Sequence, residues 1–279
     1  MLRIALAQLS AGEDRLRNLD RALEMMRRAH QAGAGLIVFP ELALERFFPQ
    51  FRREEAAGRS APEAEPIPGS TADRIAAMAR ELSLVTIFNM YEIDQHGRTF
   101  DSSPIFDADG SLRGVTRMAH ITDFEGFHEQ GYYAPADAGP AVYETSVGRI
   151  GVAICYDRHY PEYMRLLGLR GAQVVVVPQA GALGEWPEGL FEAELRTAAF
   201  QNGYWVALCN RVGPEERITF AGESFVCDPE GQIAARAPGM EEYLLLADLD
   251  TKRCERSTAR RLFWKDRRPE LYVDLSSPA

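Results

Sequence analysis

The stretch RIGVAICYDRHYPE (residues 149–162) changes from an apolar run to a charged segment within a few residues. Its first half reads as a buried strand, and Pro161 stands at a favourable first position for a helix. A sharp turn between the two would lift Cys155 out of the core towards that helix, whose N-terminus would favour the reactive thiolate. The alternative is an inert buried thiol, which is our interpretation of Cys209 and Cys227.

Strands and helices alternate along most of the chain, which predicts a single layered α/β domain over residues 1–279. Apolar runs predict strands at residues 3–9, 35–41, 84–90, 172–180, 204–212 and 242–250. Helical spacing predicts helices at 16–33, 70–82, 161–171 and roughly 188–201, and Ser70 and Asp73 have capping-box spacing. Hairpins are expected at 100–118 and 222–237. Residues 52–66 are expected to form a loop and not a domain linker.

The composition excludes several classes of protein. A formal net charge of −10 argues against a nucleic-acid partner. No stretch approaches the roughly 20 apolar residues that a membrane helix needs, and an N-terminus interrupted by Gln8 and Glu13 predicts a strand and not a signal peptide. Four cysteines without framework spacing predict free thiols in a reducing compartment, so we expect a cytoplasmic protein. Metal-ligand spacing is also lacking around His120 and His128.

Two reactive side chains stand at the ends of predicted strands. Glu41 follows LIVFP, and Cys155 follows GVAI. Ligands of such sheets bind beyond the carboxyl ends of the strands, and a carboxylate there can act as the general base for a thiol on another strand. On pattern alone Glu41 is either that base or a solvated loop acid, and both interpretations stay open.

Several short motifs follow one another along the chain, namely FPE, ICYD with a downstream PE, NRVG, F-x-G-x-S and DRRPELY. From about Leu2 to Tyr272 this ordered set resembles the nitrilase, or carbon–nitrogen hydrolase, superfamily. The resemblance implies an αββα sandwich of two mixed sheets flanked by helices, which dimerises into an αββα–αββα block. We read the run RCERSTARRLFWKDRRPE as part of a C-terminal arm, about 251–279, that crosses to a partner subunit of a homodimer or higher homo-oligomer.

The resemblance also implies a Cys-Glu-Lys active site without a metal or a cofactor. By analogy Glu41 is the general base and Cys155 is the nucleophile. Glu129, in GFHEQGYYAPAD, is a second glutamate of the family that would hold Glu41 or the substrate amide in place. The backbone N–H of Tyr156 would stabilise the oxyanion of the intermediate.

The position of the family lysine breaks the pattern. The family segment has the form Tyr-Arg-Lys-x-His, whereas residues 116–120 read TRMAH, so Met118 stands where the lysine is expected. Arg117 should face away from the pocket, because neighbouring residues of a strand point to opposite faces. The only lysines, Lys252 and Lys265, lie in the C-terminal tail. Loss of one neutral oxyanion donor costs about 10²–10³ in rate. We therefore expect weak hydrolysis or none, unless a substrate cation or another arginine compensates.

For several other polar residues, the sequence allows both a role in substrate binding and a purely structural role. We place Arg158, His159 and His120 among the substrate-binding residues; for Arg158 the alternative is a structural ion pair, and for His159 a helix cap. Trp186 is either a lid over the pocket or a surface residue. Asp101, where related sequences often carry asparagine, is a second departure from the family pattern.

The segments DRHYPE and GFHEQGYYAPAD look more like those of N-carbamoyl amine or amino-acid amidohydrolases than those of nitrile hydrolases. The sequence therefore predicts a thiol amidohydrolase that cleaves a non-peptide C–N bond of a small carbamoyl or amide substrate. One alternative is a non-catalytic or engineered-inactive member that binds such a ligand, and a second is a short-chain aliphatic amidase. The loops at 45–66, 121–137 and 180–190 decide the substrate, and the sequence alone does not give their conformations.

Overall fold

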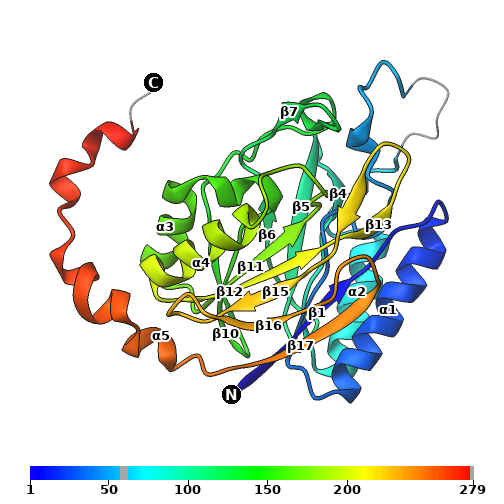
Figure 1. Cartoon of the computed structure of the whole chain (residues 1–279). Coiled ribbons are helices and arrows are strands. Elements are labelled where there is room, and N and C mark those ends of the chain that lie inside the picture. Colours follow the sequence, from blue (N-terminus) through cyan, green and yellow to red (C-terminus); the bar gives the residue numbers. More distant parts are fainter. Residues whose placement is uncertain (57–61, 277–279) are drawn as a thin grey trace.

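Two mixed β-sheets lie face to face between two pairs of helices in the computed structural model of the chain (Figure 1). The structure describes residues 1–56 and 62–276. Residues 57–61, inside the expected loop, and residues 277–279, at the end of the expected arm, lie outside the described residues.

The first sheet has the strand order β17-β1-β2-β3-β5-β4, and β6 pairs with β5. Strands β1, β2 and β3 run parallel to one another, and the other pairings are antiparallel. Its strands are β1 (Leu2–Gln8), β2 (Leu36–Val38), β3 (Val85–Ile87), β4 (Met90–Ile93), β5 (Thr99–Phe106), β6 (Leu112–Arg117) and β17 (Tyr243–Leu249). Helices α1 (Arg15–Gln31) and α2 (Ser70–Leu82) bury their apolar faces against the outer side of this sheet.

The second sheet has the strand order β16-β15-β12-β11-β10-β9, with β10, β11 and β12 parallel. Its strands are β9 (Val142–Thr145), β10 (Gly148–Val152), β11 (Val174–Gln179), β12 (Trp205–Asn210), β15 (Phe225–Cys227) and β16 (Ile233–Arg236). Helices α3 (Pro161–Leu169) and α4 (Leu190–Asn202) cover its outer side. Parallel strands covered on both faces need apolar side chains throughout, which explains the unbroken run VVVV in β11.

One apolar layer joins the two sheets. It contains side chains from both, including Leu6, Val38, Val152 and Val176, and it also contains Met118. This arrangement confirms the predicted αββα sandwich of two mixed sheets flanked by helices, whereas its dimerisation stays a prediction. Because β2 and β10 both deliver their following loops to the same end of this layer, the residues after them meet there.

Shorter elements connect these layers and form the C-terminal tail. Two small hairpins pair β7 (Asp123–Phe124) with β8 (Phe127–His128) and β13 (Val212–Pro214) with β14 (Thr219–Ala221). Single turns of helix are η1 (Phe48–Gln50), η2 (Glu129–Gly131) and η3 (Cys155–His159). The tail consists of α5 (Arg253–Arg256), η4 (Ala259–Phe263), η5 (Trp264–Asp266), η6 (Pro269–Leu271) and η7 (Val273–Ser276), and it extends away from the sandwich (Figure 1). No helix in the described part of the chain is long and apolar enough to cross a bilayer.

The predicted capping box at the start of α2 is not formed. Gly69 is the residue that precedes the helix, so Ser70 lies inside the first turn. The Glu65 carboxylate takes the capping role instead, because it accepts hydrogen bonds from the Thr71 backbone N–H at 3.0 Å and the Thr71 hydroxyl at 2.7 Å. The sequence spacing assigned the cap of α2 to Ser70 and Asp73. In the structure, a carboxylate from outside the helix accepts the hydrogen bond of a free backbone N–H in the first turn.

Packing between the sheets predicts that two leucines contribute very differently to the free energy of unfolding. Leu6 is fully buried between the sheets, whereas the side chain of Leu16, on α1, is 66% exposed. We expect Leu6→Ala to lower the free energy of unfolding by about 2–5 kcal/mol and Leu16→Ala to change it by less than about 0.5 kcal/mol. Urea unfolding followed by circular dichroism measures both variants, and equal losses would show that the inner layer is not closely packed.

Candidate active site

Cys155 and Glu41 come from different sheets and meet at the end of the apolar layer. Cys155 follows β10 and opens η3 with a backbone φ of 41°. Leu42, next to Glu41 in the loop after β2, has a φ of 46°. A positive φ is strained for both residue types and occurs where a sharp turn redirects a side chain. The two turns thus aim the thiol and the carboxylate at one point.

The Glu41 carboxylate lies in an environment that favours its protonated form. It is fully buried, and Cys155, Asp101 and Glu129 are the titratable groups that influence its charge. Among the described residues, no backbone, amide or hydroxyl group donates a hydrogen bond to it. Burial, together with the negative charges of Asp101 and Glu129, raises the pKa of Glu41 well above its ordinary value. In its ionised form, Glu41 is therefore a stronger base towards the thiol proton than an exposed carboxylate.

Arg211, from the NRVG motif, holds the loop that carries Glu41. Its guanidinium is buried and donates from Nη1 to the carbonyl oxygens of Glu41, at 2.9 Å, and Leu42, at 2.6 Å. Nη2 donates to the carbonyl of Glu45 at 3.0 Å and pairs with the Glu215 carboxylate at 2.6 Å. One planar side chain thus holds three backbone carbonyls of the loop that carries the carboxylate.

The expectation that the helix start favours a thiolate at Cys155 is wrong. The thiol is 4% exposed, and its burial, followed by the charges of Glu41 and Glu129, raises the pKa of Cys155 well above its ordinary value. Arg158 acts in the opposite direction but with a smaller effect. The expected helix, α3, begins only at Pro161, and the 3₁₀ turn η3 lies between it and the thiol, so the helix start does not outweigh desolvation. Cys155 is a neutral thiol until a base removes its proton.

Glu129 and Tyr133 are further buried polar residues of the group around Cys155 and Glu41. Glu129 opens η2, is fully buried, and receives no complete hydrogen bond on its carboxylate within the described structure. Burial, followed by the charge of Asp101, raises the pKa of Glu129 well above its ordinary value. The backbone N–H of Tyr133 donates to the Glu129 carbonyl at 2.9 Å, and the buried Tyr133 hydroxyl finds no acceptor among described groups. Both side chains are thus available to a substrate.

Met118 and Asp101, which both depart from the family pattern, lie side by side. The Met118 N–H donates to the Asp101 carbonyl at 2.9 Å, next to the paired residues Ser102 and Arg117 of β5 and β6. Met118 is fully buried in the inter-sheet layer together with Cys155. Arg117 points the other way, where its Nε donates to Glu92 at 2.9 Å. No cation therefore comes from β6 to the site.

The two histidines of the site each pair with a carboxylate. His120 Nδ1 lies 2.7 Å from Asp157 in η3, and its ring stacks on Tyr160 with centroids 3.5 Å apart. His159 Nδ1 lies 2.7 Å from Glu194. The His159 ring also contacts the Trp186 ring at a centroid distance of 5.0 Å. His120 thus supports the turn that carries Cys155, and the substrate-binding role of both histidines stays a prediction.

Arg158 presents an open guanidinium beside the nucleophile. Its side chain is 1% exposed, and Nη1 donates to the Cys155 carbonyl at 3.1 Å. The guanidinium stacks on the Phe191 ring at 4.6 Å, and Nε lies 3.6 Å from a Glu194 carboxylate oxygen. Within the described residues, Nε and Nη2 make no complete hydrogen bond. A buried fork with open N–H groups suits a carboxylate.

The sequence reasoning missed Tyr133 and Gln179. Gln179 ends β11 and is fully buried, and neither atom of its amide has a partner in the described structure. The strand-end rule that selected Glu41 and Cys155 also applies to Gln179, so a signal was present. Tyr133 lies four residues after Glu129 in the same segment, and only the fold turns its hydroxyl inward.

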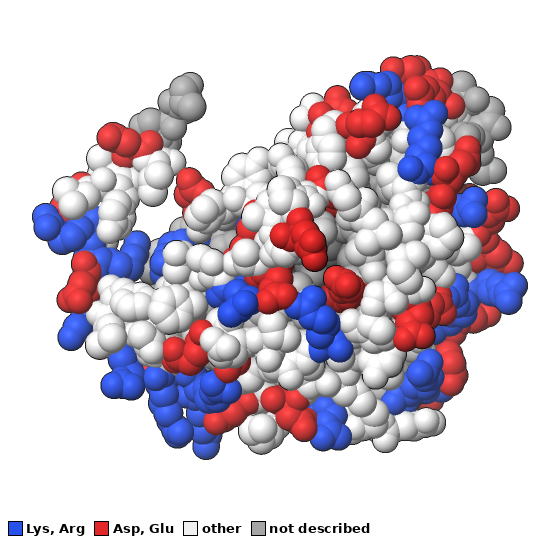
Figure 2. All heavy atoms as spheres, viewed as in Figure 1, with Lys and Arg blue, Asp and Glu red and all other residues white. Residues whose placement is uncertain are grey.

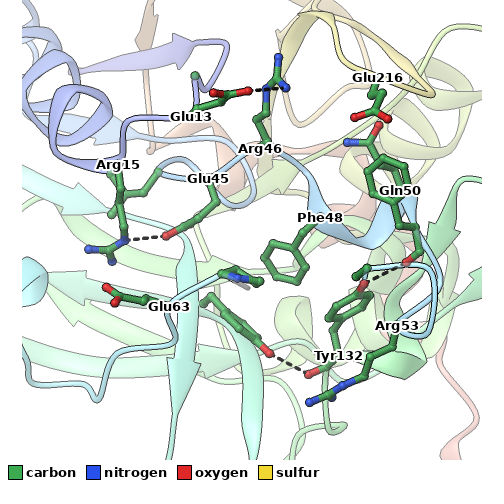
Figure 3. A pocket seen from close by; sticks show the side chains of 16 residues that line it. Glu13, Arg15, Glu45, Arg46, Phe48, Gln50, Arg53, Glu63, Tyr132 and Glu216 are labelled. Atoms are coloured by element: carbon green, nitrogen blue, oxygen red, sulfur yellow. Dashed lines mark hydrogen bonds and ion pairs between the residues drawn. The ribbon is translucent and has the colours of Figure 1, made fainter. Parts of the chain in front are cut away.

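A surface pocket of about 830 Å³, whose lining side chains are drawn in Figure 3, is separate from the residues described above. Its lining includes Arg15, Glu45, Phe48 and Tyr132, and it includes neither Glu41 nor Cys155. Charged groups in it pair with each other, as Arg15 Nε does with Glu45 at 2.7 Å. Phe48 and Tyr132 form part of the aromatic wall behind Tyr133. The reactive groups thus lie in the buried site and not in this pocket.

In the described part of the chain, no group of three or more His, Cys, Asp or Glu side chains is arranged to hold a metal.

Comparison with known proteins gives concordant matches over nearly the whole chain. A sequence model described as Carbon-nitrogen hydrolase matches residues 3–259. N-carbamoylputrescine amidase of Solanum lycopersicum is 33% identical over 98% of this chain and 94% of its own, and citrullinase of Francisella tularensis is 29% identical over 98% of both. The crystal structure of a carbon–nitrogen hydrolase from Helicobacter pylori G27 is 29% identical, covers 99% of this chain and 98% of its own, and has a TM-score of 0.89.

The contacts of Arg211 predict a specific loss of stability. Arg211→Lys keeps the charge but not the planar fork, so at least one buried carbonyl loses its donor, and we expect the free energy of unfolding to fall by about 1–3 kcal/mol. Arg74→Lys, which changes a half-exposed arginine paired with Asp20, should change it by less than about 0.5 kcal/mol. Urea unfolding of both variants tests this, and an Arg211→Lys variant as stable as the parent would contradict it.

Proposed function

The chain belongs to the carbon–nitrogen hydrolase family and is an enzyme of non-peptide C–N bonds, and from this premise we propose that its substrates are N-carbamoyl amines or N-carbamoyl amino acids. The observation that carries the proposal is that two strand ends bring the buried Cys155 thiol and the buried Glu41 carboxyl into one electrostatically coupled group. Relatives named N-carbamoylputrescine amidase and citrullinase support the carbamoyl group as the part that is recognised.

The reaction that we propose begins with a neutral thiol. Cys155 attacks the carbonyl carbon while its proton passes to Glu41, so that the S–C bond forms and the carbonyl π electrons move to oxygen. Collapse of this oxyanion breaks the C–N bond, and Glu41 returns the proton to the leaving ammonia or amine. Water then attacks the thioester-type intermediate with Glu41 again as the base. The backbone N–H of Tyr156 would bind the oxyanion in both halves.

Polar groups without a hydrogen-bond partner around the thiol could bind the carbamoyl end of the substrate and its opposite, charged end. The Glu129 carboxylate can accept a hydrogen bond from a carbamoyl NH₂ group, and the Tyr133 hydroxyl can donate one. The open N–H groups of Arg158 fit a substrate carboxylate and favour N-carbamoyl amino acids within the proposed class. Glu185, whose pKa burial raises, lies close enough to Arg158 to oppose that preference.

Met118 limits the rate in this proposal. A lysine at this position would place a positive charge beside three buried carboxyl groups and the developing oxyanion. Methionine fills the same space without charge or donor. We therefore propose that the chain hydrolyses its substrate slowly for its family. The cytoplasmic location inferred from the sequence also stays a prediction.

The C-terminal tail supports a further part of the proposal, namely a homodimer in which the arm crosses to the partner. Apolar side chains along it are exposed, with Leu262 at 50%, Leu271 at 62% and Leu275 at 66%. The arm stands off the sandwich in Figure 1, and Figure 2 shows basic side chains gathered where it begins, over α5. A second, acidic copy of the chain offers both the apolar contact and the opposite charge.

Substrate turnover tests the proposal directly. Ammonia release is measured on N-carbamoyl amino acids, N-carbamoyl amines and aliphatic amides, with kcat/KM expected to be highest for the N-carbamoyl amino acids. Cys155→Ala should abolish it, and Met118→Lys should raise kcat/KM by about 10²-fold because it restores an oxyanion cation. Met240→Lys, at a half-exposed methionine outside the site, is the matched control and should leave kcat/KM unchanged.

Two results would overturn parts of this account. Rapid turnover by the parent chain with no gain from Met118→Lys would show that another group stabilises the oxyanion. Absence of turnover from every variant on every substrate, with unchanged thermal unfolding, would favour the alternative of a binding protein that lacks catalysis.

The assembly is tested separately by sedimentation velocity. Leu271→Asp in the full chain places a charge on the arm, so we expect dissociation to monomers at concentrations where the parent sediments as a dimer or larger. Leu16→Asp, at an equally exposed leucine on α1, should leave the sedimentation coefficient unchanged. A parent chain that sediments as a monomer would end the proposal of a crossing arm.

A further inference from the structure

We propose that the substrate carries a free α-amino group and a free carboxylate at the end away from its carbamoyl group, and that Arg158, Glu194 and Gln179 bind this end. The carbamoyl group then sits on a side-chain nitrogen, so the substrate is an ω-ureido α-amino acid. The inference rests on the proposed hydrolysis of carbamoyl compounds and narrows their class. Neither Glu194 nor Gln179 belongs to the Cys-Glu-Lys pattern.

Arg158 and Glu194 form an ion pair that leaves hydrogen-bonding groups open on both sides. Arg158 Nε lies 3.6 Å from Glu194 Oε2, which is too far for a hydrogen bond. Arg158 Nη1 donates to the Cys155 carbonyl at 3.1 Å, whereas Nε and Nη2 have no hydrogen-bond partner among the described residues. Glu194 Oε1 lies 2.7 Å from His159 Nδ1, and Oε2 has no hydrogen-bond partner within the same residues. A buried ion pair repays its desolvation only when its remaining donors and acceptors are satisfied, which points to a polar ligand.

Gln179 adds an open amide beside this ion pair. Its side chain is fully buried, and neither amide atom has a hydrogen-bond partner in the described structure. Gln179 Nε2 lies 3.2 Å, and Phe191 Cζ 3.0 Å, from the point where a Cβ on Gly181 would stand, so the amide and the ring pack over the same glycine. The Arg158 guanidinium stacks on that ring, 4.6 Å from its centroid. Phe191 thus brings the open amide and the open guanidinium into one cluster.

The cluster lies between the nucleophile and the protein surface. Strand β11, which ends at Gln179, and helix α4, which carries Glu194, both pack against η3, the turn that begins at Cys155. The Arg158 side chain is 1% exposed, whereas that of Glu194 is 25% exposed. A substrate with its carbamoyl carbon at the thiol can therefore extend its other end through this cluster towards solvent.

Charge selects a zwitterion over a simple acid or a simple amine. Glu185, whose Oε2 accepts from the Ala182 N–H at 3.0 Å, is a second carboxylate that interacts electrostatically with Arg158. A ligand with only a carboxylate would add a third anion to one guanidinium, and a ligand with only an amine would leave Arg158 Nη2 unused. An α-amino acid end adds no net charge. Its carboxylate accepts from Arg158 Nη2, and its ammonium donates to Glu194 Oε2 and Gln179 Oε1.

Three ureido compounds with the same carbon chain test this end of the substrate. 2-Amino-5-ureidopentanoate carries both charges, 5-ureidopentanoate lacks the amino group, and 4-ureidobutylamine lacks the carboxylate. Ammonia release gives kcat/KM for the parent chain, and calorimetric titration of Cys155→Ala gives Kd without turnover. We expect the first compound to exceed each of the others by at least about tenfold in kcat/KM and in affinity, because each missing charge removes a charge-assisted hydrogen bond.

Two substitutions separate the acid from the amide. Glu194→Gln removes the charge but keeps an oxygen for His159, so it should lower kcat/KM about tenfold for 2-amino-5-ureidopentanoate and not for 5-ureidopentanoate. Gln179→Leu should lower kcat/KM for the same compound about tenfold without lowering the midpoint of urea unfolding, because the amide has no hydrogen-bond partner to lose in the described structure. Glu188→Gln, at an exposed glutamate just before α4, is the matched control and should leave all these values unchanged.

The two readouts separate this inference from the proposed function. If Cys155→Ala binds 2-amino-5-ureidopentanoate most tightly but the parent hydrolyses none of the compounds, the zwitterion subsite stands and the hydrolase proposal fails. If the parent hydrolyses 5-ureidopentanoate or 4-ureidobutylamine best, the hydrolase proposal stands and this inference fails. Binding of none of the three compounds to Cys155→Ala, or an unchanged preference in both Glu194→Gln and Gln179→Leu, also overturns it.

Discussion

Desolvation at the end of the inter-sheet layer is the constraint on which the rest of the site depends. Glu41, Asp101, Glu129 and Cys155 are all at most 4% exposed, so neighbouring protein groups must replace the water that would stabilise their charges. The two arginines closest to them do not neutralise this group. Each directs Nη1 to a backbone carbonyl, Arg211 to that of Glu41 and Arg158 to that of the thiol residue. The arginines therefore hold the turns in place, and the buried carboxyls and the thiol avoid charge by staying protonated.

Most of the fold was predictable because parallel strands buried on both faces leave a strong signal. Unbroken apolar runs predicted the parallel strands of both sheets, and helical spacing placed α2 at residues 70–82, as the structure has it. Neither β4 nor β9 was predicted. The errors occurred where distant residues intervene. The expected strand at 84–90 ends at Ile87, because the chain changes direction before β4, and the Glu65 carboxylate replaces the expected cap of α2. Local spacing does not contain such contacts.

The candidate site was predictable in part. The strand-end rule and the family resemblance selected Glu41, Cys155 and Glu129, which the structure brings together, although their catalytic roles stay predictions. The thiolate was wrongly expected, because the amount of water around a side chain depends on every layer of the fold. The inward hydroxyl of Tyr133 and the pairing of His120 with Asp157 were out of reach for the same reason. Burial and long-range pairing are the properties that a linear pattern conveys least.

The burial of Cys155 has a consequence for the durability of the protein. Oxidants such as peroxides attack the thiolate and convert it to sulfenic acid, and further oxidation to the sulfinic and sulfonic acids is largely irreversible. Burial and neighbouring carboxyl groups hold the pKa of Cys155 high, so the resting protein carries almost no thiolate. The same environment that delays the nucleophile until a substrate arrives therefore protects it from oxidative inactivation between turnovers.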